Sequence, residues 1–331
     1  MTNRIPDYIW TYTSGTHEAD VLYATGEQYA TGNWGEQDPD WSQALYYFGR
    51  AALGNHARAL VRLGDCFQLE LGVPCDEAKA FDWYRRGAEL KDPLALSSLA
   101  DCYKNGLGTP KNAELSKVIQ AQCFQEAWNR QTLGDPVIES IIGSCFKEGK
   151  GTALDYARGF AWIWSAAQKG YSTAQSLAGY CYLYGQGVPT DQTMALHWFQ
   201  LSAQQNNPTG QNNLGTCYYL GYGATIDYLQ ALYWFKKAAK QGSTPAMYNY
   251  GACFFEGNGV GRDYKEAYKW FLRSAQLNNE NSQCLLAKCY YNGFGVKEDL
   301  QKAKQWALKS AENGSEEGRH FYESIAHITY N

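Results

Sequence analysis

Two residue types recur along this chain at one and the same interval of 36 residues. Five cysteines between Cys145 and Cys289 keep that interval, and so do five tryptophans between Trp162 and Trp306. A fixed period of this length is the sequence signature of stacked helical repeats. Because two residue types keep the period independently, the 331 residues are predicted to form a repeat array rather than two ordinary domains.

One clear repeat shows what each unit contains. Its first part places Leu214, Cys217 and Tyr218 at helical i, i+3, i+4 spacing. Gly221 and Gly223 follow, and glycines permit the positive φ of a helix end and a tight turn. The second part carries an apolar stripe at helical spacing, formed by Ala231, Trp234, Phe235, Ala238 and Ala239. Each unit is therefore predicted to be helix, glycine turn, helix, and neighbouring units must stack to bury their stripes.

This pattern resembles the Sel-one-like repeat family, whose tetratricopeptide-like units combine L-G, a G-x-G turn, an Asp, A-x-x-W and A-A. The glycines that carry the resemblance in the first helices are Gly64, Gly143, Gly179, Gly215 and Gly251. The turn pairs are Gly106/Gly108, Gly149/Gly151, Gly185/Gly187, Gly221/Gly223, Gly257/Gly259 and Gly293/Gly295. The resemblance implies an all-α protein, a right-handed α/α superhelical solenoid of about eight helix-turn-helix repeats, most of them 36 residues long.

Laid in register, the chain divides into an N-terminal extension, eight repeats and a C-terminal capping helix. The extension covers 1–19 and the capping helix 317–331. The repeats cover 20–57, 58–93, 94–136, 137–172, 173–208, 209–244, 245–280 and 281–316. Caps are expected because an apolar stripe left open at the end of an array would aggregate.

Two repeats depart from the pattern. The turn of the first repeat is widened to ATGNWGEQDPDW, as expected of an N-terminal cap. The third repeat carries seven extra residues, since Cys102 and Cys145 are 43 apart. Seven residues make about two helical turns, so they predict an extended second helix. Alternatively, they form a loop that ends at the turn from Gly134 to Pro136.

Composition and charge exclude several classes of function. The formal net charge of −4 argues against binding of nucleic acid. No apolar run approaches the ~20 residues that cross a bilayer, so no membrane insertion is expected. The first residues lack the charged and apolar segments of a signal peptide. These features predict a soluble, cytoplasmic protein.

The remaining motifs indicate structure rather than chemistry. The seven periodic cysteines are predicted to be small buried residues, because stacked helices lie about 8–10 Å apart and bridged Cα atoms within roughly 7 Å. Cys75, Cys123 and Cys284 are irregular extras. The G-x-G turns lack the strand and third glycine of a nucleotide fingerprint. The scattered histidines show no metal spacing, so we expect no cofactor, no metal and no enzymatic activity.

The leading functional hypothesis is a non-catalytic scaffold or adaptor that binds another protein or peptide on its concave face, with a monomer favoured. The resemblance suggests a bacterial regulatory protein, a host-directed effector or an effector-neutralising protein. Translocation into a host cell without a cleavable signal is compatible with this setting. The alternatives are a secreted cysteine-rich, enzyme-like relative, which would carry disulfides, and a eukaryotic adaptor of protein degradation.

The binding face is predicted by analogy with tetratricopeptide arrays. We call equivalent positions in successive repeats a column, and the face consists of those first-helix columns that the core does not use. Toward the N-terminus these columns are charged, with Glu27, Asp65, Asp101, Lys104 and Lys147. Farther on they become an aromatic and polar stripe. We predict that the protein-binding residues are Tyr180, Leu183, Tyr184, Asn212, Thr216, Tyr219, Leu220, Tyr248, Phe255, Lys288 and Tyr291. If the register is one residue off, or the superhelix closes tightly, these rings belong to the core instead.

Overall fold

The computed structural model describes residues 17–32 and 37–328, and within these ranges it contains helices and turns but no strand. The first helices of eight successive pairs are α1 (His17–Ala30), α4 (Ala57–Gln68), α6 (Pro93–Asn105), α8 (Pro136–Glu148), α10 (Ser172–Tyr184), α12 (Pro208–Leu220), α14 (Thr244–Glu256) and α16 (Glu280–Asn292). The second helices are α3 (Trp41–Leu53), α5 (Glu77–Glu89), α7 (Ala113–Asn129), α9 (Tyr156–Gln168), α11 (Gln192–Gln204), α13 (Tyr228–Lys240), α15 (Tyr264–Gln276) and α17 (Leu300–Glu312), and α18 (Glu316–Ile325) follows them. The predicted all-α solenoid of about eight helix pairs is confirmed.

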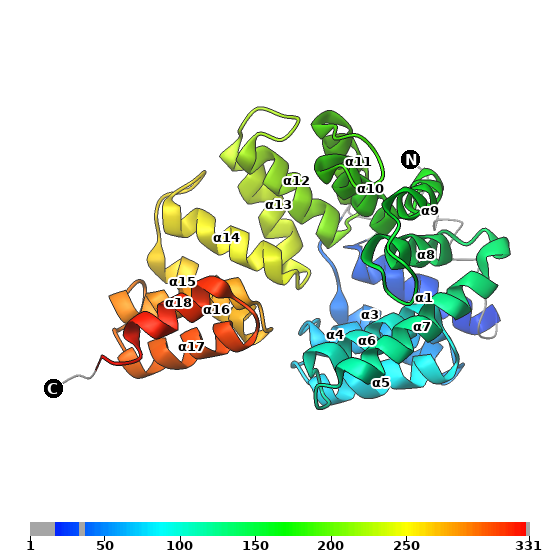
Figure 1. Cartoon of the computed structure of the whole chain (residues 1–331), viewed down its shortest axis with the longest axis horizontal. Helices are drawn as coiled ribbons and strands as arrows, with labels where there is room; N and C mark the ends of the chain where they lie inside the picture. Colours follow the sequence, from blue (N-terminus) through cyan, green and yellow to red (C-terminus); the bar gives the residue numbers. More distant parts are fainter. Residues whose placement is uncertain (1–16, 33–36, 329–331) are drawn as a thin grey trace. The chain divides into compact units, whose positions relative to one another are not determined.

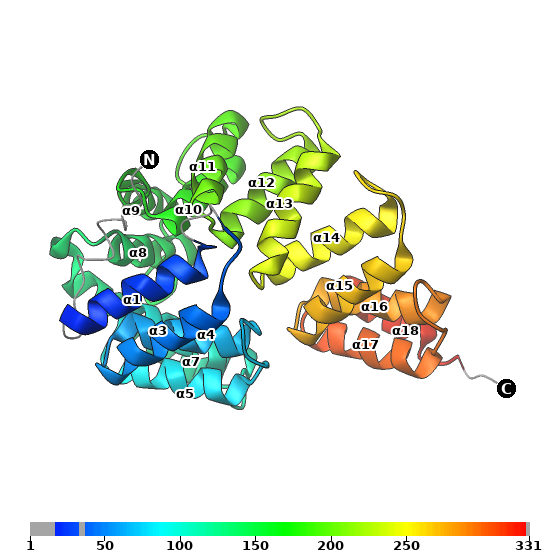
Figure 2. The ribbon, with the colours of Figure 1, turned by 180° about the vertical axis from the view of Figure 1, so that it is seen from behind.

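The helices group into two compact units, 1–210 and 211–331, and the boundary falls within α12. Figure 1 labels the helices in chain order, and Figure 2 shows the same ribbon from behind. The predicted extension over 1–19 lies outside the described residues except for 17–19, which belong to α1. Part of the widened first turn, 33–36, and the end of the predicted capping segment, 329–331, also lie outside them.

Capping residues that recur at the same place in each repeat explain where the helices begin and end. An Asp precedes each second helix from α9 onward, and its carboxylate accepts backbone N–H groups of the first turn. These caps are Asp155, Asp191, Asp227, Asp263 and Asp299. A cap of this kind contributes about 1 kcal/mol. At the other side of the turn, Gly185 takes the left-handed conformation (φ 68°), and its N–H donates to the Cys181 carbonyl oxygen to end α10.

The second glycine of the turn joins neighbouring repeats. Gly187 has a φ of 78°, and a Cβ built on it would lie 2.0 Å from the carbonyl oxygen of Tyr156, at the start of α9. Gly295 stands in the same relation to Tyr264, with a distance of 2.0 Å. Any side chain at these positions would push one repeat away from the preceding one. The G-x-G pair therefore serves both to end a helix and to stack repeats.

Within a pair, a glycine of the first helix receives a large side chain of the second. A Cβ on Gly215 would lie 2.7 Å from the ring of Phe235, and one on Gly251 would lie 2.8 Å from the ring of Phe271. Both rings are fully buried. The seven periodic cysteines are buried as well, as predicted. Where a ring occupies such a glycine notch, the core of the pair therefore consists of that ring flanked by small residues.

The seven extra residues of the third repeat lengthen both its second helix and the connection that follows, so each of the two predicted alternatives, helix and loop, is partly right. The helix α7 has 17 residues where its counterparts such as α9 have 13, and the 3-10 turn η2 (Gln131–Leu133) lengthens the connection to α8. Trp128, near the end of α7, meets the rings of Phe146 and Trp162 edge-on. The prediction of an extended helix is thus right for about one turn, and the rest forms a connection.

A buried ion pair links helix pairs on either side of this insertion. The Arg58 guanidinium of α4 donates to the carboxylate of Asp135, the residue that caps α8, and both side chains are almost fully buried. The same Asp135 accepts the N–H of Val137 at 2.9 Å. Removing one partner of such a pair leaves an uncompensated buried charge, which costs about 3–5 kcal/mol. The longer third repeat is therefore held between two pairs that are also tied to each other.

His56 caps α4 from a buried position. Its Nδ1 accepts the N–H of Ala59 at 3.2 Å, and its ring stacks on Tyr23 with 4.4 Å between centroids. Its Nε2 lies 3.5 Å from Oδ1 of Asp20. Burial, followed by the charge of Arg58, lowers the pKa of His56 from 6.5 to about 4. The ring is therefore neutral in the folded chain at neutral pH.

We predict that Gly215→Leu lowers the free energy of unfolding by about 1–3 kcal/mol, because the new side chain would overlap the Phe235 ring. Chemical denaturation measures the loss. Gly261→Leu is the matched control, since a Cβ at Gly261 meets no atom within 4 Å and its φ is not positive. Equal stability of the two variants would contradict the notch.

We predict that His56→Asn makes stability less dependent on pH while preserving a capping side chain. Between pH 4 and 6.5 the unfolded chain binds a proton that the folded chain does not. The contribution of neutral His56 is therefore complete above pH 6.5 and is lost as the pH falls, by about 2 kcal/mol at pH 5. Denaturant titrations at pH 7.5 and at pH 5 test this, and an equal loss in both proteins would refute it.

Candidate functional site

Four of the predicted binding residues line one groove in the unit 211–331. Thr216, Tyr219 and Leu220 come from α12, and Tyr248 comes from α14. The cavity measures about 220 Å³. Its other lining residues are Phe235, Asn249, Ala252 and Glu256. We call this cavity the α12–α14 groove.

Hydrogen bonds hold the polar walls of the groove in place. The Tyr219 hydroxyl donates to Oε2 of Glu256, and Nδ2 of Asn258 lies 2.8 Å from both of these oxygens. Burial, followed by the hydrogen bond to Glu256, raises the pKa of Tyr219 well above its usual value. At the other side, Nδ2 of Asn249 donates to Oδ1 of Asn212 at 2.9 Å. These contacts orient the side chains before any ligand arrives.

Apolar surface remains open at the rim of the groove. Leu220 is 48% exposed, whereas Tyr219 and Tyr248 are half-buried and present part of their rings. Phe235, which fills the notch of Gly215, is buried and also belongs to the lining. The groove thus combines aromatic walls with a few oriented polar groups, the composition usual for ligand sites.

Other predicted residues of this unit make contacts within the chain instead. Phe255 packs edge-on against Tyr264 and Phe294. Lys288 forms an ion pair with Glu317 and lies 5.9 Å over the ring of Phe321. Asn212 and Lys288, the predicted polar contacts to a partner, are therefore both engaged by side chains of the chain itself. The same Phe321 ring meets Tyr291 edge-on.

The unit 1–210 holds the remaining part of the predicted stripe, on α10. Tyr180 and Tyr184 are 37% and 56% exposed, and their ring centroids are 4.4 Å apart. Leu183 is half-buried beside them. The ammonium of Lys147 lies 5.0 Å from the centre of the Tyr180 ring. This part of the stripe is a small aromatic surface on which the Lys147 ammonium lies.

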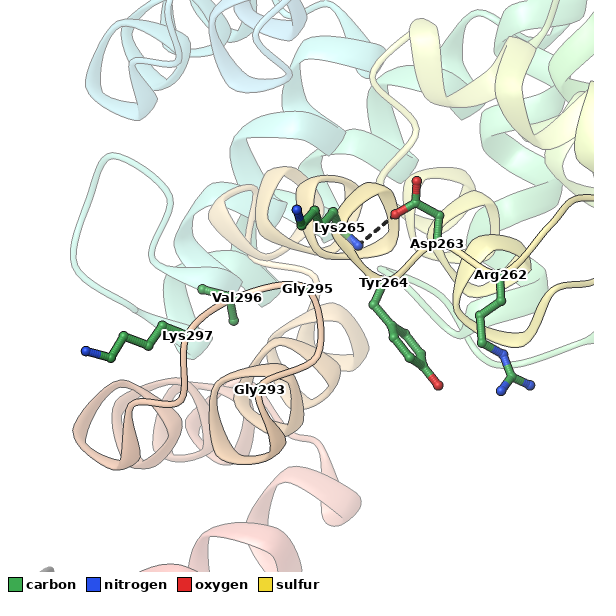
Figure 3. A pocket seen from close by; sticks show the side chains of 8 residues that line it. All are labelled: Arg262, Asp263, Tyr264, Lys265, Gly293, Gly295, Val296 and Lys297. Carbon is green, nitrogen blue, oxygen red and sulfur yellow. Dashed lines mark hydrogen bonds between the residues drawn. The ribbon is translucent and has the colours of Figure 1, made fainter.

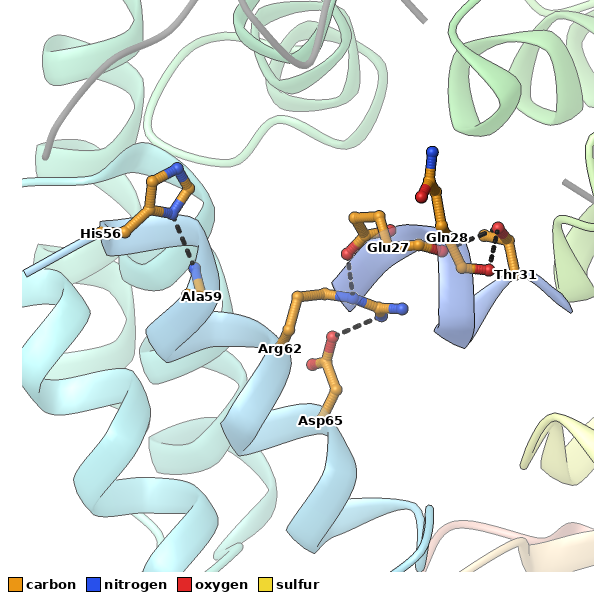
Figure 4. Close-up of polar contacts among 7 residues, drawn as sticks. All are labelled: Glu27, Gln28, Thr31, His56, Ala59, Arg62 and Asp65. Atoms are coloured by element: carbon orange, nitrogen blue, oxygen red, sulfur yellow. Dashed lines mark hydrogen bonds and ion pairs between the residues drawn. The ribbon is translucent and has the colours of Figure 1, made fainter. Parts of the chain in front are cut away.

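The charged residues predicted toward the N-terminus are largely paired. Figure 4 shows the Arg62 guanidinium between Glu27 and Asp65, at 2.7 and 3.2 Å. The Asp101 carboxylate lies 3.9 Å from the ammonium of Lys150. Each of these three carboxylates thus has a basic partner, from the same helix for Asp65 and from the next repeat for Glu27 and Asp101.

A second hollow of about 550 Å³ lies where two turns of the unit 211–331 meet. Figure 3 shows Arg262, Lys265 and Lys297 on its walls, with the Asp263 carboxylate accepting the N–H of Lys265. Gly295 here approaches the start of α15, as described above. The hollow is formed by the joint between two repeats, and its acid is committed to a helix cap.

The cysteines do not form a reactive site. Nine of the ten are buried, and Cys75 is exposed. Burial raises the pKa of seven thiols to about 11 or 12, which keeps them protonated and poorly nucleophilic. These are Cys66, Cys102, Cys181, Cys217, Cys253, Cys284 and Cys289.

Neither a metal-binding cluster nor a membrane-spanning helix is found among residues 17–32 and 37–328. Over these ranges, His, Cys, Asp and Glu side chains nowhere gather in groups of three that could hold a metal ion. None of the helices in the same ranges combines the length and apolar character needed to cross a membrane.

The prediction misses four lining residues of the α12–α14 groove: Phe235, which it assigns to the core stripe of its repeat, and Asn249, Ala252 and Glu256. Asn249 lies one position after the column of Asn212, whereas Ala252 and Glu256 occupy the columns of Thr216 and Leu220 one repeat later. Reading complete columns, rather than large side chains only, would have found the last two.

Comparison with known proteins gives the family. The model of the Sel1 repeat matches residues 19–56, 57–92, 93–117, 141–171, 172–207, 208–243, 244–279 and 281–315. The chain belongs to the Sel1 repeat family. The predicted relationship to Sel-one-like repeat proteins of the tetratricopeptide-like superfamily is confirmed.

Solved structures of similar fold come from different settings. A Sel1 repeat protein from Oxalobacter formigenes is 24% identical, with a TM-score of 0.55 over 98% of this chain and 95% of that one. The Cut9–Hcn1 complex of the APC/C gives a TM-score of 0.54 at 13% identity, over 97% of this chain and 58% of that one. At these identities the likeness concerns the fold alone.

One curated relative is similar over a short stretch. The "Putative ERAD-associated E3 ubiquitin-protein ligase component" of Schizosaccharomyces pombe is 32% identical over 75 residues, or 22% of this chain. The match spans 10% of that relative's length.

We predict that a thiol reagent labels one cysteine of the native protein rapidly, Cys75, and all ten after denaturation. Burial protects the other nine, and in seven of them it also raises the pKa. Mass spectrometry identifies the labelled peptide, and Cys75→Ser should abolish the fast phase. Rapid labelling of a second thiol would show that a repeat opens easily.

Proposed function

We propose that this Sel1 repeat protein is a non-catalytic adaptor that binds a partner protein or peptide in the α12–α14 groove. The proposal depends on one observation: four of the predicted binding residues line the same cavity. Hydrogen bonds within the chain orient the polar side chains of this cavity. Aromatic side chains in a partly open groove are typical anchors of protein interfaces. Tyr180, Leu183 and Tyr184 are proposed as a further contact surface on the other unit.

The chemistry of the groove supports binding rather than catalysis. Its lining contains one carboxylate, Glu256, and hydroxyl groups on Thr216, Tyr219 and Tyr248. The Tyr219 hydroxyl is committed to Glu256, and that of Thr216 donates to the carbonyl oxygen of Asn212 at 3.0 Å. A nucleophile would need an adjacent base, and the lining offers none to a free hydroxyl.

For the setting we propose a cytoplasmic, monomeric adaptor. The ten free thiols support a compartment in which cysteines stay reduced. A second candidate is an adaptor of protein degradation, which the 75-residue similarity to the Schizosaccharomyces pombe relative favours. Both candidates use the repeats to hold another protein, so the same experiment addresses them.

The test compares captured proteins between two variants that carry the same substitution. Leu220→Glu places a charge at the rim of the groove, whereas Leu229→Glu places it on α13, where the side chain is 68% exposed and outside the groove. Both should change stability by no more than about 0.5 kcal/mol. In quantitative affinity capture from the source organism, specific partners should remain with Leu229→Glu and be lost with Leu220→Glu. Retention of every partner by Leu220→Glu would refute the groove.

A further inference from the structure

The α12–α14 groove contains a negative charge that the chain does not balance. The carboxylate of Glu256 accepts hydrogen bonds from Tyr219 and Asn258, and both donors are neutral. Arg262, the basic residue that follows, donates instead to the backbone carbonyl oxygen of Glu256 at 3.3 Å. No ion pair to a cation is formed by this carboxylate within the described ranges.

At the equivalent position of another repeat, a glutamate is paired with a lysine of the same chain. Glu148 lies 108 residues, or three periods, before Glu256 and also ends a first helix. There the ammonium of Lys150 pairs with the carboxylate at 2.8 Å. Three periods later the counterpart of Lys150 is Asn258. Repeat 245–280 therefore has the same acid but an amide at the position where repeat 137–172 has the pairing cation.

Space for a cation is provided at the same place. Ala252 lines the groove in a column that holds Tyr180, Thr216 and Lys288 in other repeats. Its small side chain lines the cavity of about 220 Å³ together with Tyr219, Tyr248 and Glu256. Cations bind favourably within about 6 Å of an aromatic ring centre. The chain uses this contact itself on α10, where Lys147 lies over Tyr180.

We propose that the α12–α14 groove binds a lysine or arginine side chain of a partner peptide, with its charge beside the Glu256 carboxylate and its aliphatic part against the rings of Tyr219 and Tyr248. An acidic side chain would be repelled there, and an apolar one would cover the carboxylate without compensating its charge. The exposed Leu220 at the rim favours an apolar residue next to the basic one in the partner. This inference rests on the proposed function, since it names the partner chemistry for the same groove.

The test uses the full chain and a phage-displayed library of random dodecapeptides. We expect selected peptides to share one Lys or Arg beside an apolar residue. Synthetic versions of one selected peptide, with the basic residue retained or replaced by norleucine, are then titrated against the wild type and Glu256→Gln. The amide of Gln still accepts the hydrogen bonds of Tyr219 and Asn258, so the fold should be unchanged. Glu298→Gln, an exposed acid of the same unit, is the control.

We expect norleucine to weaken binding to the wild type about tenfold or more, as loss of a charge-assisted contact does. Glu256→Gln should weaken the basic peptide to a similar extent and leave the norleucine peptide within about twofold. Glu256→Lys should prefer a version that carries Glu at the basic position. If selected peptides bind the wild type equally well with norleucine, or bind Glu256→Gln unchanged, the cation site is refuted.

In the same assay, peptide binding by Leu220→Glu and Leu229→Glu tests the proposed function separately from the cation site. If basic peptides are selected but Leu220→Glu binds them as well as Leu229→Glu does, the groove is not where they bind and both proposals fail. If apolar or acidic peptides are selected and Leu220→Glu loses them, the groove binds peptides and only the cation is wrong. If no sequence is enriched over the naive library, the groove does not bind short peptides and both proposals fail.

Discussion

Close contact between a glycine and a large side chain inside most of the described helix pairs is the interaction on which the fold depends. The Phe235 ring reaches the backbone of α12 because Gly215 has no Cβ, and Phe271 does the same at Gly251. In the last pair the small residue is larger and the large residue is smaller. The equivalents of Gly215 and Phe235 there are Ala287 and Ala307, both fully buried. The total volume at the contact is thus kept within limits, as the close packing of protein interiors requires. This contact sets the distance between the two helices and hence the position of every side chain on the outer faces.

Stacking of repeats depends on a different constraint, the approach of the G-x-G turn to the preceding second helix. Because this joint involves backbone atoms, it tolerates changes of side chain elsewhere in the repeat. The third repeat illustrates this, since it keeps Gly106 and Gly108 while its second helix grows to 17 residues. The additional length requires its own contacts, and Trp128 together with the Arg58–Asp135 pair provides them.

The sequence predicts most of the fold because the repeat is an internal comparison: eight copies indicate which positions are buried. The site is less predictable because side chains on neighbouring first helices meet at offsets that depend on the stacking geometry. Thr216, Tyr219, Leu220 and Tyr248 meet as their columns suggest. Phe255 and Lys288 occupy the same columns, yet they contact Phe294 and Glu317, because the following helices supply partners there. A column identifies the face of a helix, whereas the neighbours decide whether that face is open.

Departures from the repeat therefore carry more functional information than the repeat itself. A position that keeps its residue type in nearly all units serves packing, as the seven periodic cysteines do. A position that has a charge but no intramolecular counter-ion is different, because its charge remains available to a group outside the chain. Glu256 is exposed and accepts hydrogen bonds from two neutral donors, so its charge is tolerated but not neutralised. Ala252 has the complementary property, since a residue smaller than its equivalents gives up packing contacts in the same place. Neither change stabilises the isolated chain, and together they provide what the proposed cation site requires, an accessible carboxylate with open space beside it.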